Sequence, residues 1–389
     1  MDCQRLFEEI DSLSERYLKF WIDVCGIESP TEYKAGVDAV GAYFAARAKE
    51  MGWETEVFEQ PVSGNCVTVT MNPDAPLPPI ALSGHMDTVH PVGLFGTPAV
   101  RREGNLLYGP GVTDCKGGTV ASFLAMEALK NCGYTARPVK LILQSDEEGG
   151  SRQSNKATVA YMARTAKDCA AFLNTEGATL GRLTLERKGI ARYRFEICGV
   201  AAHSSRCYDG ASAIAEAAHK ILALEKWKDK DGITCNCGLI QGGTTANTVP
   251  ATCTLVADIR YKTAAQRDEI EARVNEIAST SYVGGTTCTV SPFSHRVSME
   301  YNTRNAALFE RVQAIFDAMG LPHVEPGSAT GGSDAADMTA YGIPALDCFG
   351  VVGGKLHSKD EFAYVDSLAA SAKMQAAVIY CFDMRKESL

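Results

Sequence analysis

Three consecutive carboxylates, Asp146, Glu147 and Glu148, follow the apolar stretch 139–144 and precede two glycines. Adjacent negative charges repel one another, and glycine gives a strand no side chain to pack. An acidic turn at the end of a strand would explain the pattern simply. The alternative is a cation that makes the crowding favourable, and such a cation needs further ligands from elsewhere in the chain.

Three other segments place metal-binding side chains at or just after the end of a predicted strand, and one more lies near the C-terminus. They are SGHMDTVHP with His85 and Asp87, GPGVTDCKGG with Asp114, LNTEG with Glu176, and GKLHSKDE with His357. In open α/β sheets, ligands collect beyond the carboxyl ends of the strands. Each residue alone is explained as well by an ordinary turn or a strand-end charge, but the segments together predict a metal site.

The donor types indicate which metal this site would hold. Two imidazoles and several carboxylates form a mixed nitrogen and oxygen set, which suits Zn²⁺ better than Mg²⁺ or Ca²⁺. The carboxylates are too many for one tetrahedral ion, whereas two ions about 3.5–4 Å apart and bridged by one carboxylate use them economically. Asp87 is close enough to His85 to hold the second imidazole N–H and fix its tautomer. Co²⁺ or Mn²⁺ could replace zinc, because such sites follow availability as well as affinity.

The elements that would position these residues belong to a layered α/β domain. A chain of 389 residues exceeds what one hydrophobic core usually serves, so two domains are expected. The apolar stretches predicted as strands are 65–71, 79–84, 139–144 and 170–176, and the predicted helices between and after them include 117–133 and 154–164. Near-continuous apolar strands separated by helices predict a mostly parallel sheet.

The pattern changes near residue 187, where alternating strands and amphipathic helices follow in a β-α-β-β-α-β-like order. This order predicts a small α+β unit with its sheet covered on one face. The first pattern returns from about residue 297. We therefore expect a catalytic domain formed by 1–186 and 297–389, and an inserted domain formed by 187–296.

Composition excludes several classes of function. The net charge is −9 and no run of Lys or Arg stands out, so nucleic acid and anionic membranes are poor candidates as partners. No stretch approaches about 18 uninterrupted apolar residues, and the N-terminal stretch 1–21 contains acidic residues and no apolar signal core. The fourteen cysteines are scattered, and the spacing of Cys235 and Cys237 does not fit a zinc ribbon. We expect most of them to be small buried hydrophobes in a reducing cytoplasm.

The motifs SGHMDTVHP, GPGVTDCKGG, QSDEEGGS, TEG and HSKDE, in this order, closely resemble a known family. It is the di-zinc family of glutamate carboxypeptidase, aminoacylase, acetylornithine deacetylase and succinyl-diaminopimelate desuccinylase. The resemblance runs over essentially the whole chain, and the inserted domain of that family is a lid and dimerisation domain. The stretches 199–217, 246–261 and 330–346 look like the glutamate carboxypeptidase branch.

Matched by position, the resemblance implies a first zinc on His85, Asp114 and Glu176. It implies a second zinc on Asp114, Glu148 and His357, so that Asp114 bridges the two ions. It also implies a cis peptide bond after Asp114.

The resemblance further assigns catalytic roles. Glu147 would be the general base, taking a proton from a zinc-bound water whose pKa is lowered to about 7, and later protonating the leaving amine. Asp87 would orient His85. His203 would reach across a homodimer into the partner's active site and stabilise the tetrahedral oxyanion. An exposed loop histidine is the alternative for His203.

The substrate-binding candidates lie in the second half of the chain. Asn247 and Arg260 match positions that bind the terminal carboxylate of the substrate in the carboxypeptidase branch, a task that suits the two-pronged guanidinium. A strand-end salt bridge is the alternative for Arg260. Gly331, Gly332 and Ser333 would line the pocket through backbone groups, although a plain turn explains them nearly as well.

The expected function is hydrolysis of an amide bond in a small peptide or N-acyl amino acid, by an exopeptidase that releases a C-terminal amino acid such as glutamate. The alternative is a deacylase of the acetylornithine deacetylase or succinyl-diaminopimelate desuccinylase type, which would use the same metal ligands. Glu rather than Asp at position 176 argues, by family pattern, against the tripeptide and dipeptide aminopeptidase branches. A non-catalytic metal-binding homologue is disfavoured because Glu147 and all five ligands are present.

Overall fold

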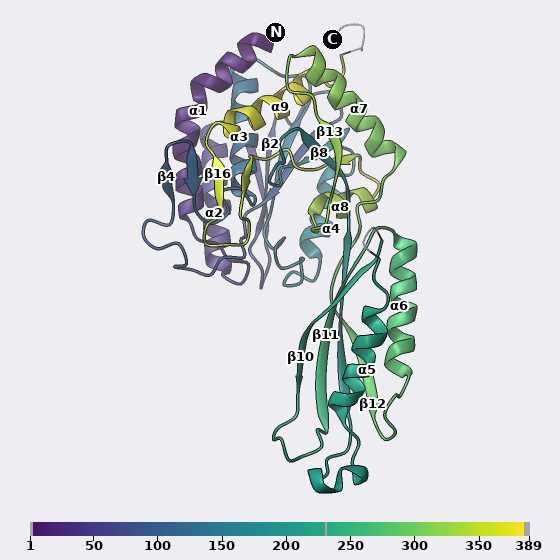
Figure 1. Ribbon diagram of the computed structural model, residues 1–389. Helices are drawn as coiled ribbons and strands as arrows, with labels where there is room; N and C mark the ends of the chain where they lie inside the picture. Colours follow the sequence, from purple (N-terminus) through teal and green to yellow (C-terminus); the bar gives the residue numbers. More distant parts are fainter. Residues whose placement is uncertain (1–2, 230–231, 385–389) are drawn as a thin grey trace. The chain divides into compact units, whose positions relative to one another are not determined.

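The computed structural model describes residues 3–229 and 232–384. The chain divides into two compact units (Figure 1). Unit 1 consists of Met1–Leu185, Tyr301–Ser328 and Ser333–Leu389, and unit 2 of Glu186–Glu300 and Ala329–Gly332. The sequence-based division placed residues 186, 297–300 and 329–332 in the first domain. They group with unit 2 because the backbone of Met299 pairs with Arg187, and Ala329 accepts the N–H of Lys188.

The centre of unit 1 is a six-stranded sheet in the order β1-β2-β6-β3-β7-β14. Its strands are β1 (Glu54–Phe58), β2 (Cys66–Met71), β3 (Ile80–His85), β6 (Val139–Gln144), β7 (Ala171–Asn174) and β14 (Ala345–Leu346). β6, β3, β7 and β14 run parallel to one another, and β2 is antiparallel to both of its neighbours. Every residue of β3 and of β7 is buried, as expected for strands covered on both faces.

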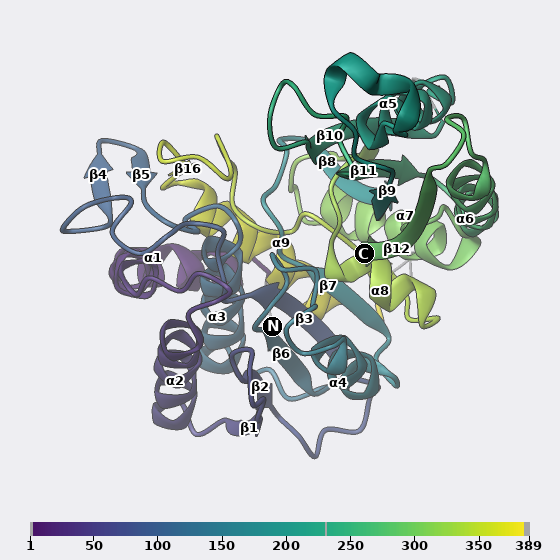
Figure 2. The same cartoon turned by 90° about the horizontal axis from the view of Figure 1, so that it is seen from below.

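Helices cover both faces of this sheet. They are α1 (Cys3–Gly26), α2 (Lys34–Glu50), α3 (Lys116–Asn131), α4 (Ala157–Ala166), α7 (Thr303–Ala318), α8 (Asp334–Ala340) and α9 (Ser367–Cys381). Figure 2 shows α3 on one side of β3 and β6 and α4 on the other. Apolar side chains of α1, α3 and α9 form one core with alternate residues of β3 and β6, including Leu82 and Leu141. The predicted α/β class with a mostly parallel sheet is confirmed.

Smaller strands complete unit 1. A four-stranded sheet joins β4 (Arg101–Glu103), β5 (Leu106–Tyr108), β15 (Gly353–Gly354) and β16 (Phe362–Tyr364), and β8 (Arg182–Arg187) pairs with β13 (Glu325–Ala329). None of these strands was predicted. Those of the four-stranded sheet have only two or three residues each, which are too few to show a periodic pattern. The four-stranded sheet matters for the site, since His357 lies in the connection between β15 and β16.

Unit 2 has the predicted α+β order. It contains β9 (Gly189–Cys198), the 3₁₀-helix η1 (Ser204–Asp209), α5 (Ala213–Glu225), β10 (Thr234–Gly242), β11 (Thr252–Tyr261), α6 (Ala264–Ser279) and β12 (Thr287–Arg296). The strands form an antiparallel sheet in the order β10-β11-β9-β12, and α5 and α6 pack on one face (Figure 1). β9 and β11 alternate between buried and less buried residues, as a sheet covered on one face requires.

The expectations about membrane-spanning segments and about the cysteines can be compared with the described part of the chain. None of its helices combines the length and the apolar character needed to cross a membrane. The cysteines whose side chains are described are free thiols, and most of them are buried.

Candidate metal centre

Most of the predicted ligands follow three neighbouring strands of the unit 1 sheet. β3 ends at His85 and lies between β6 and β7. The chain leaves β6 into Glu147 and Glu148, and leaves β7 into Glu176. Because the three strands are parallel, their carboxyl ends share one edge of the sheet.

The other two ligands come from loops. Asp114 immediately precedes Cys115, the N-terminal capping residue of α3, and the Asp114–Cys115 peptide bond is cis, as the resemblance implied. His357 lies between β15 and β16 with a positive φ of 60°. Its imidazole is exposed, whereas Asp114 is buried.

The carboxylate of Asp114 lies between the two histidines. Its Oδ1 is 3.2 Å from Nε2 of His85, and its Oδ2 is 3.1 Å from Nε2 of His357. Glu176 is on the first side, with Oε1 at 3.8 Å from Nε2 of His85. Glu148 is on the second side, with Oε2 at 3.3 Å from Nε2 of His357. The five side chains therefore form two groups that share one carboxylate.

The electrostatics of the cluster fit a cation site. Burial, followed by the charge of Asp114, raises the pKa of Glu148 to about 8. Burial raises the pKa of Glu176 well above its usual range, and Asp114 and Glu147 add to this effect. Carboxylates that are buried together resist ionisation unless positive charge is nearby. Cations held by these residues would supply that charge.

The histidines and carboxylates of the cluster shift one another's pKa values. Hydrogen bonds with Asp114 and Glu148 raise the pKa of His357 to about 10 despite some burial. Burial opposes protonation of His85, but Cys115, Asp114 and Asp87 together outweigh it and raise its pKa. Hydrogen bonds from the same two histidines outweigh burial at Asp114 and hold its pKa well below its usual range.

The donor atoms are close enough for shared coordination. His85, Asp114 and Glu148 each offer an atom within 4.8 Å of the others, and so do His85, Cys115 and Glu176. The Cys115 thiol accepts the backbone N–H of His85 at 2.9 Å, and burial raises its pKa. A protonated thiol is a poor ligand, so the nitrogen and oxygen donors remain the better description of the site.

Asp87 connects the two sides of the cluster. Its Oδ1 is 3.4 Å from Nδ1 of His85, which also contacts the Asp87 backbone carbonyl at 2.9 Å. Its carboxylate accepts the backbone N–H groups of Glu147 and Glu148, each at 3.1 Å. The hydroxyl of Thr31 donates to it at 2.7 Å. Sequence reasoning missed Thr31, because nothing in the stretch before α2 signals a contact 56 residues away.

The three adjacent carboxylates Asp146, Glu147 and Glu148 have different surroundings in the structure. Asp146 is fully buried and holds its own loop, since it accepts the N–H of Ser154 at 3.0 Å and the hydroxyl of Thr158 at 2.8 Å. Glu147 is 7% exposed, and its backbone is fixed by Asp87. Glu148 contacts His357. The acidic run therefore combines a loop anchor with the predicted base and a predicted ligand.

Unit 2 carries His203 and Asn247 in paired segments. The backbone of His203 bridges to Thr248, and Ser204 donates its N–H to the carbonyl of Asn247 at 2.9 Å. His203 is exposed and caps η1, with Nδ1 at 2.8 Å from the hydroxyl of Ser205. Both predicted residues thus lie at one end of the unit 2 sheet.

Arg260 also belongs to unit 2 and forms an ion pair. Its Nε donates to Oδ1 of Asp258 at 2.6 Å, and Asp258 also binds Arg192 at 2.6 Å. Asp258 was not singled out from the sequence. The salt bridge that was the alternative for Arg260 is therefore present.

The predicted glycine-rich segment is divided between the units. The carbonyls of Gly331 and Gly332 accept from Nη1 of Arg187 at 3.3 and 3.4 Å. The hydroxyl of Ser333 is buried, donates to Asp347 at 2.5 Å and caps α8. The hydroxyl of Ser333 is therefore already bonded within unit 1. Only backbone groups of the segment fit the predicted role of lining the substrate pocket.

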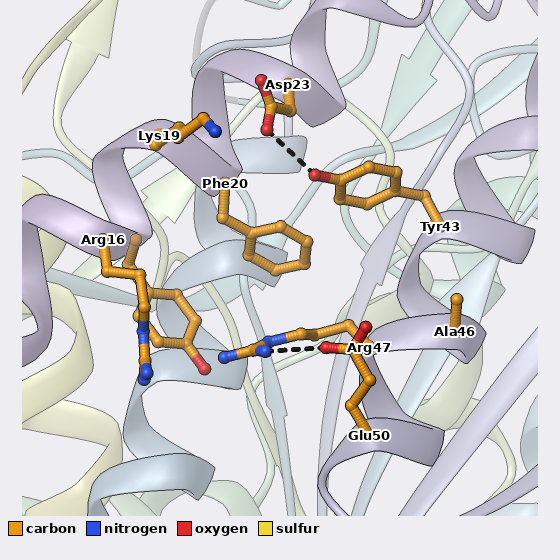
Figure 3. A pocket seen from close by; sticks show the side chains of 9 residues that line it. Arg16, Lys19, Phe20, Asp23, Tyr43, Ala46, Arg47 and Glu50 are labelled. Carbon is orange, nitrogen blue, oxygen red and sulfur yellow. Dashed lines mark hydrogen bonds and ion pairs between the residues drawn. The ribbon is translucent and has the colours of Figure 1, made fainter.

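A pocket of about 290 Å³ lies between α1 and α2, and none of the predicted site residues lines it (Figure 3). Its cations are met by carboxylates. Arg47 binds Glu50 and Glu127, and Arg16 also binds Glu127. Because both arginines are paired within the protein, we assign no ligand to this pocket.

Comparison with known proteins now gives the family. Residues 81–380 match the model of peptidase family M20/M25/M40, so the chain belongs to this family. The resemblance noted in the motifs is confirmed, and the protein is a hydrolase of the peptidase or deacylase kind. Members of this family typically bind a metal, and zinc is typical among them.

Two relatives are similar to this chain in sequence, and one solved structure is similar to it in fold. The chain is 26% identical over 388 residues to carboxypeptidase G2 of Pseudomonas sp., covering 97% of this chain and 92% of the relative. It is 22% identical over 356 residues to succinyl-diaminopimelate desuccinylase of Methylocella silvestris, covering 87% and 91%. The fold matches aminopeptidase PepT from Bacillus cereus with a TM-score of 0.78, at 20% identity, over 94% of this chain and 98% of that one.

Proposed function

We propose that the chain is a two-zinc amidohydrolase that releases a C-terminal amino acid from a small peptide or an N-acylated amino acid. The observation that supports this most is the Asp114 carboxylate, whose two oxygens contact the imidazoles of His85 and His357 separately. One carboxylate shared between two ligand groups is the arrangement that a pair of bridged ions requires. The relative named carboxypeptidase G2, which covers nearly the whole chain, supports the carboxypeptidase activity.

Zinc held by the five ligands would polarise the amide carbonyl and lower the pKa of a water molecule to about 7. Glu147 is the proposed general base, which takes a proton from the attacking water and delivers it to the leaving amine. Its backbone is fixed through Asp87, which also orients His85, so the base and a ligand are positioned by the same side chain.

Residues of unit 2 are proposed to bind the substrate. Asn247 and Arg260 would bind its terminal carboxylate, with Gly331 and Gly332 contributing backbone groups. His203 of a second copy would stabilise the oxyanion, so the proposal includes a homodimer. The ion pair of Arg260 with Asp258 would then hold the guanidinium in position before the substrate binds.

A deacylase is the second candidate function, favoured by the desuccinylase relative that covers 87% of this chain. The two functions share the metal ligands and Glu147, and they differ in the part of the substrate that is recognised. A deacylase would recognise the amino acid and accept a short acyl group, whereas the carboxypeptidase would accept a longer acyl or peptidyl group.

Hydrolysis assays on the purified chain test the proposal. The substrates are an N-acylated dipeptide ending in glutamate and N-acetylornithine, each assayed with zinc-loaded and with chelator-treated protein. Release of glutamate only by the zinc-loaded protein is the expected result. Turnover of N-acetylornithine alone would replace the carboxypeptidase with the deacylase, and hydrolysis of neither substrate would contradict both.

A further inference from the structure

A fully buried glutamate that has no proposed role so far lies against the loop that carries Asp114. Glu361 ends the motif HSKDE, in which only His357 received a role, and its side chain is fully buried. A buried carboxylate is costly unless hydrogen bonds and opposite charge compensate it. Its partners therefore indicate why the chain keeps a charge there.

The carboxylate of Glu361 holds the backbone around Asp114. Its Oε1 accepts the N–H of Thr113 at 2.9 Å and that of Asp114 at 3.1 Å. Its Oε2 is also 3.4 Å from the N–H of Gly111. Hydrogen bonds from backbone N–H groups to an ionised carboxylate are stronger than neutral ones, so this part of the loop is tightly held.

The fourth partner is His90, whose Nε2 lies 2.7 Å from Oε2 of Glu361. His90 is 4% exposed and follows β3 in the same loop that carries Asp87. Its ring packs edge-on against Phe95 at a centroid distance of 5.0 Å. No role was predicted for His90 from the sequence, and the structure shows it buried and paired with Glu361.

Glu361 thus contacts two loops that carry predicted site residues and belongs to a third. His90 belongs to the loop of His85 and Asp87, the N–H groups belong to the loop of Asp114, and Glu361 itself follows His357 by four residues. Displacement of any one loop would change the spacing between Asp114 and the two imidazoles. One buried carboxylate therefore connects the segments whose relative placement defines the centre.

We propose that Glu361, with His90 as its partner, is a positioning residue that fixes the bridging carboxylate of Asp114 midway between the two metal positions. The proposal rests on the proposed two-metal function. It concerns residues that contact the backbone of a ligand and not the metal itself. Partners of this kind are typically worth about 10–100-fold in metal affinity or activity.

Cobalt binding to the full chain tests the proposal without relying on turnover. The variants Glu361→Gln, His90→Ala and His90→Gln are titrated with Co²⁺ after chelator treatment, and the visible absorption bands report the coordination geometry. Glu361→Gln keeps the size of the side chain but loses the charge and one acceptor. We expect its Co²⁺ affinity to fall about 10–100-fold and its bands to shift. His90→Gln can still donate to Glu361, so it should lose less than His90→Ala.

Glu127→Gln is the matched control. Glu127 is also buried and ionisable, but it is held by Arg16, Arg47 and Tyr17 beside the pocket between α1 and α2. This control should lose thermal stability and keep the Co²⁺ affinity and spectrum of the wild type. For Glu361→Gln we further expect kcat to fall while KM changes less than twofold, because the substrate contacts lie elsewhere.

Each outcome separates this proposal from the proposed function. Wild-type affinity and spectrum in Glu361→Gln, or changes no larger than those of Glu127→Gln, would overturn the positioning role. Wild-type protein that binds two Co²⁺ ions but hydrolyses no substrate would contradict the proposed function, and the cobalt titrations would still decide the role of Glu361. Wild-type protein that binds no Co²⁺ would overturn both.

Discussion

Glu147 and Glu148 are neighbours in the chain, but the structure gives them different surroundings. Asp87 holds the backbone N–H groups of both residues, but it is the carboxylate of Glu148 that lies 3.3 Å from Nε2 of His357. Their proposed roles as base and ligand therefore predict different losses. Glu147→Gln should lower kcat by about 10²–10⁴ and retain both zinc ions, because only the proton transfer is removed.

Metal content measured beside kcat checks this expectation, with Glu148→Gln as the comparison. Glu148→Gln should lose one of the two ions, since an amide oxygen is a weaker ligand than a carboxylate. A Glu147→Gln variant that stays within tenfold of the wild type would contradict the assignment of the base.

Thr31 offers a second test with a single side chain. Its hydroxyl donates to Asp87 at 2.7 Å, and both residues are buried. Thr31→Val removes this donor while keeping the shape, so Asp87 loses one of the bonds that orient it. A hydrogen bond to a charged group is worth about 1.5–3 kcal/mol, so we expect kcat/KM to fall about 10–100-fold.

Thr68→Val is the control for this variant, because Thr68 is equally buried and bonds to the hydroxyl of Tyr161 at 2.7 Å, with no contact to the site residues. It should change the unfolding temperature and leave kcat/KM unchanged. Equal effects of the two variants on kcat/KM would show that Thr31 has no special connection with Asp87.

The position of the site depends on close contact between the backbone of α3 and the backbone of the loop that follows β7. α3 begins beside the loop that follows β7, and a Cβ atom added at Gly118 would lie 2.1 Å from the carbonyl oxygen of Thr175, next to Glu176. Gly118→Ala should therefore push α3 and Glu176 apart. We expect a loss of about 1–3 kcal/mol in the free energy of unfolding, together with weaker zinc binding.

Denaturant unfolding and zinc titration of Gly118→Ala measure both effects. Gly26→Ala is the control, because Gly26 ends α1 and has no atom within 4 Å of an added Cβ. Alanine normally favours a helix by about 1 kcal/mol over glycine, so a stabilised Gly118→Ala variant would contradict the close approach.

Part of the fold and of the site could be predicted from the sequence alone. β6 was predicted with the bounds that the structure has, because its apolar residues are nearly continuous. The convergence of His85, Glu148 and Glu176 followed from the rule that ligands gather at the carboxyl ends of parallel strands. Thr31 and Glu361 were missed, because contacts between distant loops leave no periodic signal in the chain. Asp258 lies on β11, and the alternation of that strand does not show that Asp258 pairs with Arg260 and Arg192.

The two units should respond differently to loss of metal, since all five proposed ligands belong to unit 1. Zinc at 1,000 times its dissociation constant would stabilise the folded state by about 4 kcal/mol. Chelation should therefore raise amide hydrogen exchange in the loops 83–91 and 109–118 and leave α6 of unit 2 unchanged. Added Zn²⁺ should restore protection, and Mg²⁺ should not. Unchanged exchange in both loops would contradict metal binding at this edge.

The most direct test of the account is a crystal structure of the zinc-loaded protein with anomalous diffraction data at the zinc edge. We predict two anomalous peaks about 3.5–4 Å apart, one on each side of the Asp114 carboxylate, with His85 and Glu176 at the first and His357 and Glu148 at the second. A single peak, or peaks that Asp114 does not bridge, would contradict it.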